Sequence, residues 1–252
     1  MMLADFPKKG EFSPTVTRFY YGFDISTYPG DSQMSTWWTS SPFYWVGFYL
    51  APAPHHSNTS WMSKRSTLKN QGWGLAPIYV GRQAGDGSKL TTAQGITDAQ
   101  NASSLASQAG FPSNAFVFLD IEQGGTLSTA FMNYIKGWIN ELFNNTPFNV
   151  GVYCNAYQTA AQIRAAVPTI GVQFWCVNVN CPPSQGCVGV GTPPDPHGCG
   201  VTYSGDWQFA QSPKPGGINC PGYTGGNCSQ TFGGVTLLVD LDTSYFANPS
   251  FG

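Results

Sequence analysis

The chain has 252 residues, which suits one large domain, and only 10% of them are charged, against 15% that are aromatic. With a formal net charge of −2 and no run of Lys or Arg longer than two residues, it lacks the clustered cations that nucleic-acid binding needs. No apolar stretch approaches the ~20 residues of a membrane span, and the composition is not that of a disordered chain.

Strand and helix signals alternate along the chain with short spacing. Apolar runs predict eight strands, at residues 19–26, 44–51, 74–81, 115–122, 150–155, 172–179, 206–211 and 237–242. Helical spacing and helix-forming composition predict intervening helices at residues 33–40, 61–71, 91–109, 127–142 and 157–166. Residues 180–205 and 213–235 hold Pro, Gly and Cys where the last helices would be expected, so we predict loops there.

Most of these strands are too apolar to leave one face in water. Together with the interleaved helices they predict an α/β fold, with a parallel sheet closed into a single irregular (β/α)8 barrel of the TIM type. A doubly wound open sheet is the alternative, but the chain has no Gly-rich first turn. We expect residues 1–18 to be an N-terminal extension and residues 19–252 to form the barrel. Disulfide-stapled loops are expected in place of the last helices, at the end where barrels carry their active sites.

Six of the seven cysteines lie in one Gly/Pro-rich third of the chain: Cys176, Cys181, Cys187, Cys199, Cys220 and Cys228. Cysteines in loops of poor regular structure indicate disulfides and an oxidising compartment, so we expect a secreted or cell-surface protein. A metal cluster is the alternative, but no CxxC pair occurs and only His197 lies nearby. The seventh cysteine, Cys154, is expected to be a buried free thiol. Residues 1–17 hold no signal-like apolar core, so either a signal has been removed or export uses another route.

The segment from Leu119 to Glu122 ends a predicted strand with two carboxylates one residue apart. Side chains alternate along a strand, so Asp120 and Glu122 point to the same face, with their Cα atoms roughly 6.6 Å apart. Like charges this close resist being ionised together, so one acid can stay protonated near neutral pH. That arrangement suits general acid catalysis, whereas the alternative is that the acids only cap the next helix.

Acidic residues end other predicted strands as well. Asp24 ends the first strand, and Asp240 and Asp242 end the eighth, so closure of the barrel would bring them to the edge that carries Asp120 and Glu122. Aromatic and polar residues occupy comparable positions at other strand ends: Tyr79, Arg82, Trp175 and Gln208. Pyranose rings stack on aromatic rings, so this combination indicates a sugar-binding site. For the arginine, an ion pair with an acid at the barrel mouth is equally consistent.

Four segments resemble, in order, motifs of family 25 glycoside hydrolases, which are β/α-barrel lysozymes that cut peptidoglycan: Gly22–Tyr28, Leu119–Glu122, Asp206–Phe209 and Val239–Asp242. The segment Trp45–Pro52 more closely resembles a related domain of unknown function, the glycoside-hydrolase-like β/α barrels. The resemblance spans roughly Phe19 to Tyr245, nearly the full chain.

The resemblance implies a role for each acidic residue. Glu122 would be the general acid that protonates the leaving glycosidic oxygen. Asp120 would stabilise the developing positive charge or position the substrate's amide, and Asp24 and Asp240 would shape the sugar subsite. Lysozyme-type members often carry Asn at the position of Asp242, so this extra carboxylate is a departure that points to a different glycan.

These features predict a secreted, monomeric glycoside hydrolase that cleaves a cell-wall polysaccharide of the peptidoglycan type, with no metal or cofactor. The alternative is a catalytically silent barrel that binds a cell-wall glycan, since both proteins need the same aromatic residues around the site. A binding-only barrel would be free to lose one acid, and all four are present: Asp24, Asp120, Glu122 and Asp240. The intact set favours the enzyme.

Overall fold

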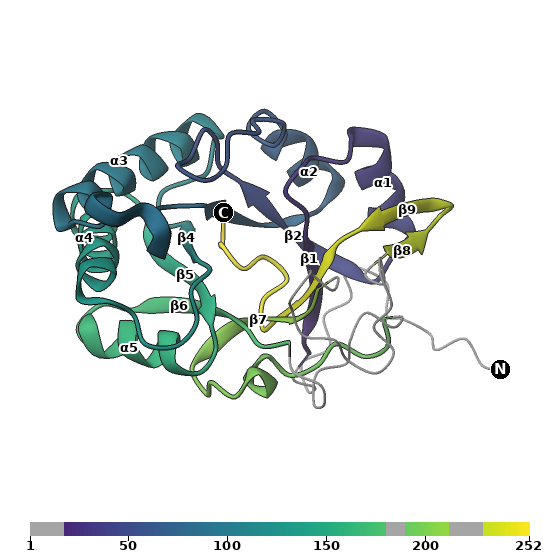
Figure 1. Ribbon diagram of the computed structural model, residues 1–252. Helices are drawn as coiled ribbons and strands as arrows, with labels where there is room; N and C mark the ends of the chain where they lie inside the picture. The colour runs from purple at the N-terminus through teal and green to yellow at the C-terminus, as the bar shows by residue number, and fades with distance from the viewer. Residues whose placement is uncertain (1–17, 180–189, 212–228) are drawn as a thin grey trace.

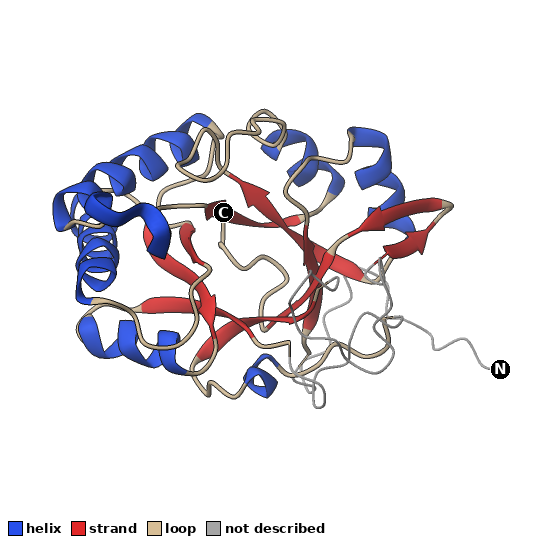
Figure 2. Cartoon of the chain, in the orientation of Figure 1, coloured by secondary structure: helices blue, strands red, loops and turns tan. Residues whose placement is uncertain are grey.

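The computed structural model describes residues 18–179, 190–211 and 229–252, and its core is a closed barrel of eight strands. The helices lie outside the barrel (Figures 1 and 2). Neighbouring strands follow the order β1-β10-β7-β6-β5-β4-β3-β2 around the barrel. The bounds of these strands are β1 Tyr20–Asp24, β2 Phe43–Tyr49, β3 Gly74–Tyr79, β4 Phe116–Ile121, β5 Asn149–Asn155, β6 Val172–Val177, β7 Ser204–Ala210 and β10 Asp240–Ser244. The predicted α/β barrel is confirmed.

The last barrel strand runs in the opposite direction from the one predicted. β10 pairs antiparallel with both β1 and β7, whereas β1 to β7 pair in parallel with one another. We call the end of the barrel at which β1 to β7 terminate the mouth. Because β10 starts there, its first residue, Asp240, lies opposite Asp24 at the end of β1. The reversal keeps Asp240 at the predicted edge and moves Asp242 deeper into the barrel, opposite Gly22.

The predicted helices are present with boundaries close to those expected: α1 Asp31–Ser40, α2 Arg65–Gln71, α3 Thr92–Gln108, α4 Thr129–Asn145 and α5 Gln158–Ala166. The two longest begin with hydroxyl caps, because the side chain of Thr91 accepts from the N–H of Gln94 and that of Ser128 accepts from the N–H of Phe131. Two short 3-10 helices also occur, η1 Ala84–Lys89 and η2 Pro196–Cys199. None of the described helices is long and apolar enough to cross a membrane.

A hairpin that the sequence analysis did not predict precedes β10. Its strands are β8 Ser229–Phe232 and β9 Val235–Leu238. Gly233 and Gly234 form the turn with φ of 55° and 78°, a left-handed conformation that favours glycine. The hairpin packs on α1, where the indole N–H of Trp37 donates to the carbonyl oxygen of Val235 over 3.1 Å. The strand predicted at 237–242 is therefore divided between β9 and β10.

Aromatic rings fill the barrel interior below the mouth. Trp45, Phe118 and Trp175 are fully buried, and the Trp175 ring packs edge-on against the other two with centroid distances of 5.1 and 5.7 Å. These rings fit because neighbouring strands carry glycine: a Cβ at Gly22 would lie 2.1 Å from the Trp45 ring, and one at Gly151 would lie 2.4 Å from the Phe118 ring. The interior is thus a packed core, which supports polar side chains at the mouth.

The described cysteines are all buried free thiols: Cys154, Cys176 and Cys199. This confirms the prediction for Cys154, but the prediction that Cys176 and Cys199 form disulfides is wrong. Cys176 lies beside Cys154 on neighbouring strands. A hydrogen bond with Cys154 and burial raise the pKa of Cys176, and a hydrogen bond with Cys176 and burial raise that of Cys199, so both thiols stay neutral. They act as small apolar side chains of the hydrophobic cluster that the barrel strands share with the surrounding helices. The other predicted disulfide partners lie outside the described residues: Cys181, Cys187, Cys220 and Cys228.

Candidate functional site

Three strands bring the predicted catalytic carboxylates to the mouth. Asp24 and Asp240 are directly opposite each other on antiparallel strands, an arrangement that places Cβ atoms about 4.5–5.5 Å apart. Asp120 lies on β4, and Glu122 follows the last residue of that strand. Asp24 and Asp120 are 8% and 6% exposed, whereas the residue Glu122 is exposed. Among the four acids, Glu122 is therefore the one most open to a ligand from solvent.

Hydroxyl and amide groups fix the directions of two of these carboxylates. The Tyr49 hydroxyl on β2 donates to Oδ1 of Asp24 over 2.6 Å. Gln208 on β7 donates from Nε2 to Oδ2 of Asp240 over 3.0 Å and accepts from the Tyr153 hydroxyl on β5 over 2.5 Å. Since Tyr49, Gln208 and Tyr153 all belong to barrel strands, Asp24 and Asp240 are held by rigid elements. Gln208 thus lies in the mouth layer, as predicted.

The environment of Tyr153 shows that the acids converge. Burial raises the pKa of its hydroxyl well above the usual value, and negative charge nearby raises it further. The charges that act on this hydroxyl come from four carboxylates, Glu122, Asp120, Asp24 and Asp240. Three of the same acids, together with burial, raise the pKa of Tyr49. Both tyrosines therefore stay protonated and can donate hydrogen bonds within a cluster of acids.

Asp242 and Trp175 lie one layer below the mouth, and both are fully buried. The indole N–H of Trp175 donates to Oδ1 of Asp242 over 3.0 Å. Burial raises the pKa of Asp242 well above its usual value, the charges of Asp24 and Asp240 raise it further, and the Trp175 hydrogen bond opposes the shift. The surroundings of Asp242 therefore favour its protonated form over its charged form. The structure does not bring Asp242 or Trp175 to the surface, where both were predicted to contact substrate.

Tyr79 and Arg82 face the outer helices instead of the mouth. Tyr79 is 1% exposed, and its hydroxyl donates to Oδ1 of Asn101 on α3 over 3.0 Å. Nε of Arg82 lies 3.5 Å from Oδ2 of Asp98, also on α3. Both residues thus belong to the packing of β3 against α3, away from the mouth, where they were predicted to contact substrate. The sequence pattern misled because β3 is apolar on both faces, so it does not show which residues point inward.

Three residues of the mouth were missed by the sequence analysis: Tyr49, Tyr153 and Gln83. Tyr49 and Tyr153 each follow, by two positions, a glycine on the inner face of a strand, Gly47 and Gly151. Strict use of strand alternation would have found both tyrosines. Gln83 lies in the loop after β3, where no periodic pattern operates, so nothing in the sequence singles it out.

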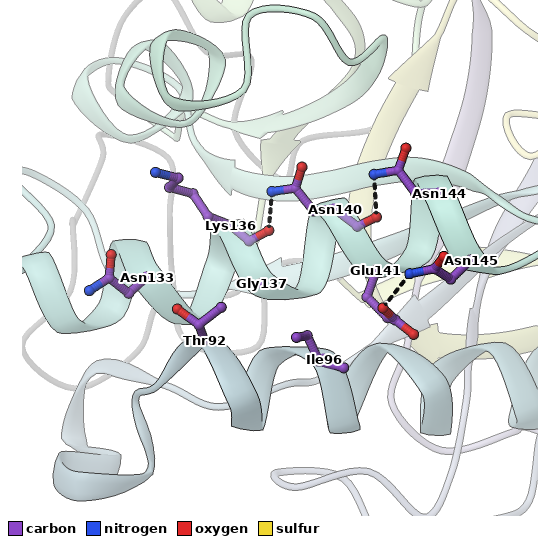
Figure 3. A pocket seen from close by; sticks show the side chains of 9 residues that line it. All are labelled: Thr92, Ile96, Asn133, Lys136, Gly137, Asn140, Glu141, Asn144 and Asn145. Atoms are coloured by element: carbon purple, nitrogen blue, oxygen red, sulfur yellow. Dashed lines mark hydrogen bonds between the residues drawn. The ribbon is translucent and has the colours of Figure 1, made fainter.

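A groove of about 380 Å³ lies outside the barrel, between α3 and α4 (Figure 3). Its lining is rich in amides: Thr92, Ile96, Asn133, Lys136, Gly137, Asn140, Glu141, Asn144 and Asn145. Several of its donors are already used, since Asn140 donates to the carbonyl oxygen of Lys136 over 2.7 Å and Asn144 to that of Asn140 over 2.8 Å. The groove contains none of the predicted site residues. Nowhere in the described ranges are three or more His, Cys, Asp or Glu side chains grouped to hold a metal ion.

A family model described as the Rv2525c-like, glycoside hydrolase-like domain matches residues 35–180, more than half of the chain. The chain belongs to this family. The match confirms the resemblance to glycoside-hydrolase-like barrels that the segment Trp45–Pro52 indicated. A search among curated proteins found no match for this Rv2525c-like chain.

Solved structures share the fold of the Rv2525c-like chain. The Tat-secreted protein Rv2525c of Mycobacterium tuberculosis is 16% identical, with a TM-score of 0.57 over 94% of this chain and 98% of its own. A family 25 glycosyl hydrolase of Streptococcus pneumoniae is 11% identical, with a TM-score of 0.55 over 88% and 86%. A bacterial lysozyme from Streptomyces coelicolor is 16% identical, with a TM-score of 0.53 over 88% and 90%. At these identities the likeness establishes a barrel fold shared with lysozymes.

Proposed function

We propose that this Rv2525c-like protein is a secreted glycoside hydrolase that cleaves a cell-wall polysaccharide of the peptidoglycan type. The observation that carries the proposal is the placement of four acids at the mouth, with Asp24 opposite Asp240 and with Asp120 and Glu122 at the end of β4. Glycosidic bonds are cut in most such enzymes by a pair of acids, one that protonates the leaving oxygen and one that acts on the sugar ring. The fold shared with lysozymes supports the same chemistry.

Glu122 is the proposed general acid. Its exposure leaves it open to the glycosidic oxygen of a polysaccharide lying across the mouth. It gives its proton to that oxygen as the bond to the sugar carbon breaks, and it regains a proton from the water that completes hydrolysis. Asp120, the buried acid two residues earlier on β4, stabilises the positive charge that develops on the ring or positions the substrate's amide.

Asp24 and Asp240 are proposed to shape the sugar subsite. Tyr49 and Gln208 each occupy one oxygen of these acids, so the carboxylates keep a fixed direction. Carboxylates held in this way can accept hydrogen bonds from sugar hydroxyls, and these charge-assisted bonds are stronger than neutral ones.

The proposal of export rests on the cysteines outside the described residues and on one structural relative. Cys176 and Cys199 are buried free thiols, so they give no support for disulfides or for an oxidising compartment. Four cysteines in Gly/Pro-rich segments still suit an oxidising compartment, and one structural relative is described as Tat-secreted.

A catalytically silent barrel that binds the same glycan is the second candidate. The exposure of Glu122 favours it, because general acids of glycosidases commonly lie in apolar surroundings that keep them protonated. The two candidates differ in turnover and not in binding.

Incubation of the purified protein with peptidoglycan, chitin-type and other polysaccharides separates the candidates. Released fragments are detected by mass spectrometry, and bound protein is measured by co-sedimentation with the insoluble glycans. Fragments from a peptidoglycan-type polymer are the expected result. Co-sedimentation without any released fragment would assign the protein to the binding-only class.

A further inference from the structure

The pairing between β4 and β3 ends just before the two proposed catalytic acids, Asp120 and Glu122. β4 pairs with β3 only at Phe118 and Leu119, opposite Ile78 and Tyr79. On its other side, β4 stays paired with β5 as far as Ile121. The ladder between β3 and β4 therefore ends at Leu119, one residue before Asp120.

The side chain of Gln83 occupies this position. Its Nε2 donates to the carbonyl oxygen of Asp120 over 2.9 Å, and its Oε1 accepts from the backbone N–H of Glu122 over 3.1 Å. One donor and one acceptor directed at residues i and i+2 reproduce the contacts that the N–H and C=O of a single residue in a parallel strand would make. The Gln83 amide thus continues the β3–β4 ladder by one step after β3 has ended.

Gln83 is itself held firmly. Oδ2 of Asp86 accepts from the backbone N–H of Gln83 over 2.7 Å, and the backbone N–H of Asp86 donates to the carbonyl oxygen of Gln83 over 2.9 Å. Nε2 of His55 lies 2.7 Å from the same Oδ2 of Asp86. These bonds fix the backbone from which the Gln83 amide extends, so the amide reaches β4 with little freedom to move.

We propose that Gln83 is a positioning residue, which sets the direction of the Glu122 carboxyl relative to Asp120 by clamping the main chain on both sides of Ile121. The inference rests on the proposed role of Glu122 as general acid. Glu122 is exposed and lies beyond the end of its strand, so packing does little to orient it. A reacting group displaced by about 1 Å can lose as much as ~10²-fold in rate, so a clamp at this point governs turnover more than binding.

The test compares Gln83→Met with Gln100→Met. Met has nearly the length of Gln but neither donor nor acceptor. Gln100 is a matched control, because its amide also joins two elements, with Nε2 2.8 Å from Oε1 of Glu141 between α3 and α4. Gln83→Asn serves as a second variant, since it keeps the amide but is shorter by one methylene and cannot reach both main-chain groups.

Two quantities are measured on each variant. The first is the hydrogen-exchange rate of the Glu122 backbone N–H by NMR, which we expect to rise at least ~10-fold in both Gln83 variants and to stay unchanged in Gln100→Met. The second is glycan hydrolysis, for which we expect kcat to fall ~10–100-fold with KM within about threefold of the wild type.

An unchanged exchange rate at Glu122 would overturn the clamp, and a faster exchange with unchanged kcat would overturn its positioning role. An equal loss of kcat in Gln100→Met would also overturn it, because the effect would then be general destabilisation. A wild-type protein that hydrolyses no glycan would refute the proposed function, and the exchange rate would still decide whether the clamp exists.

Discussion

Replacing Asp206 with Asn should remove a large pH dependence of stability. Asp206 on β7 is fully buried, and Gln173 on β6 donates to its Oδ2 over 2.8 Å. Burial raises the pKa of its carboxyl from 3.8 to about 7, although hydrogen bonds from Ser244 and Gln173 oppose the shift. The carboxyl is therefore neutral in the folded protein up to about pH 7, and it ionises near pH 4 once the chain unfolds.

The sign and size of the effect follow from proton linkage. An acid whose pKa is higher in the folded state binds more protons there than in the unfolded state, so the free energy of unfolding falls as pH rises. The fall begins near the unfolded pKa of 3.8 and is complete above the folded pKa of about 7. About three pKa units at ~1.36 kcal/mol each give a loss of ~4 kcal/mol. Asn has nearly the size of the protonated acid and no proton to release, so Asp206→Asn avoids this loss.

Urea unfolding of both proteins between about pH 4.5 and about pH 7.5 measures the effect. The stability of the variant should exceed that of the wild type by an amount that grows with pH, by up to ~4 kcal/mol above pH 7. Asp242, whose pKa burial also raises, is present in both proteins, but the charge of Asp206 is one of the causes of its shift, so the measured difference includes the coupling between the two acids. Parallel stability curves for the two proteins would refute the reasoning.

Two further predictions concern the thiols and the mouth. Three described cysteines are buried free thiols: Cys154, Cys176 and Cys199. They should resist alkylation in the native protein and react in denaturant without any reductant, as mass spectrometry of the labelled peptides can check. A need for reductant would contradict the prediction. Tyr153→Phe removes the hydroxyl that orients Gln208 beside Asp240. Glycan hydrolysis should therefore fall by roughly 10-fold, with little change in melting temperature. An unchanged rate of hydrolysis would count against a role for the hydrogen bond between Tyr153 and Gln208.

The barrel and the edge that bears its acids were predictable because the relevant signals are local. Alternation fixes Asp120 and Glu122 on one face, and the parallel connections of β1 to β7 bring the strand ends to one end of the fold. The direction of β10 was not predictable, because an apolar run such as 237–242 has the same pattern in either direction. The Gly233–Gly234 turn did signal a hairpin, and attention to it would have moved the last strand to its observed position.

Side-chain orientation at individual strand ends was harder to predict. Tyr79 and Arg82 turn toward α3 because β3 is buried on both faces, and the sequence gives no sign of which face is the inner one. Trp175 was correctly predicted to lie on a barrel strand, but its side chain is buried in the packed interior, below the mouth. Cys176 faces other thiols because of strand register, which cysteine spacing alone does not reveal.

Glycan hydrolysis by Glu122→Gln tests the central claim most directly. Gln keeps the size and hydrogen bonding of Glu but has no transferable proton, so hydrolysis should fall by ~10²–10⁴-fold while glycan binding persists. Glu141→Gln is the matched control, since this glutamate lies on α4 at the outer groove and bonds Gln100 and Asn145. Its rate should equal that of the wild type. Hydrolysis by Glu122→Gln at the wild-type rate would contradict the assignment of Glu122 as the general acid.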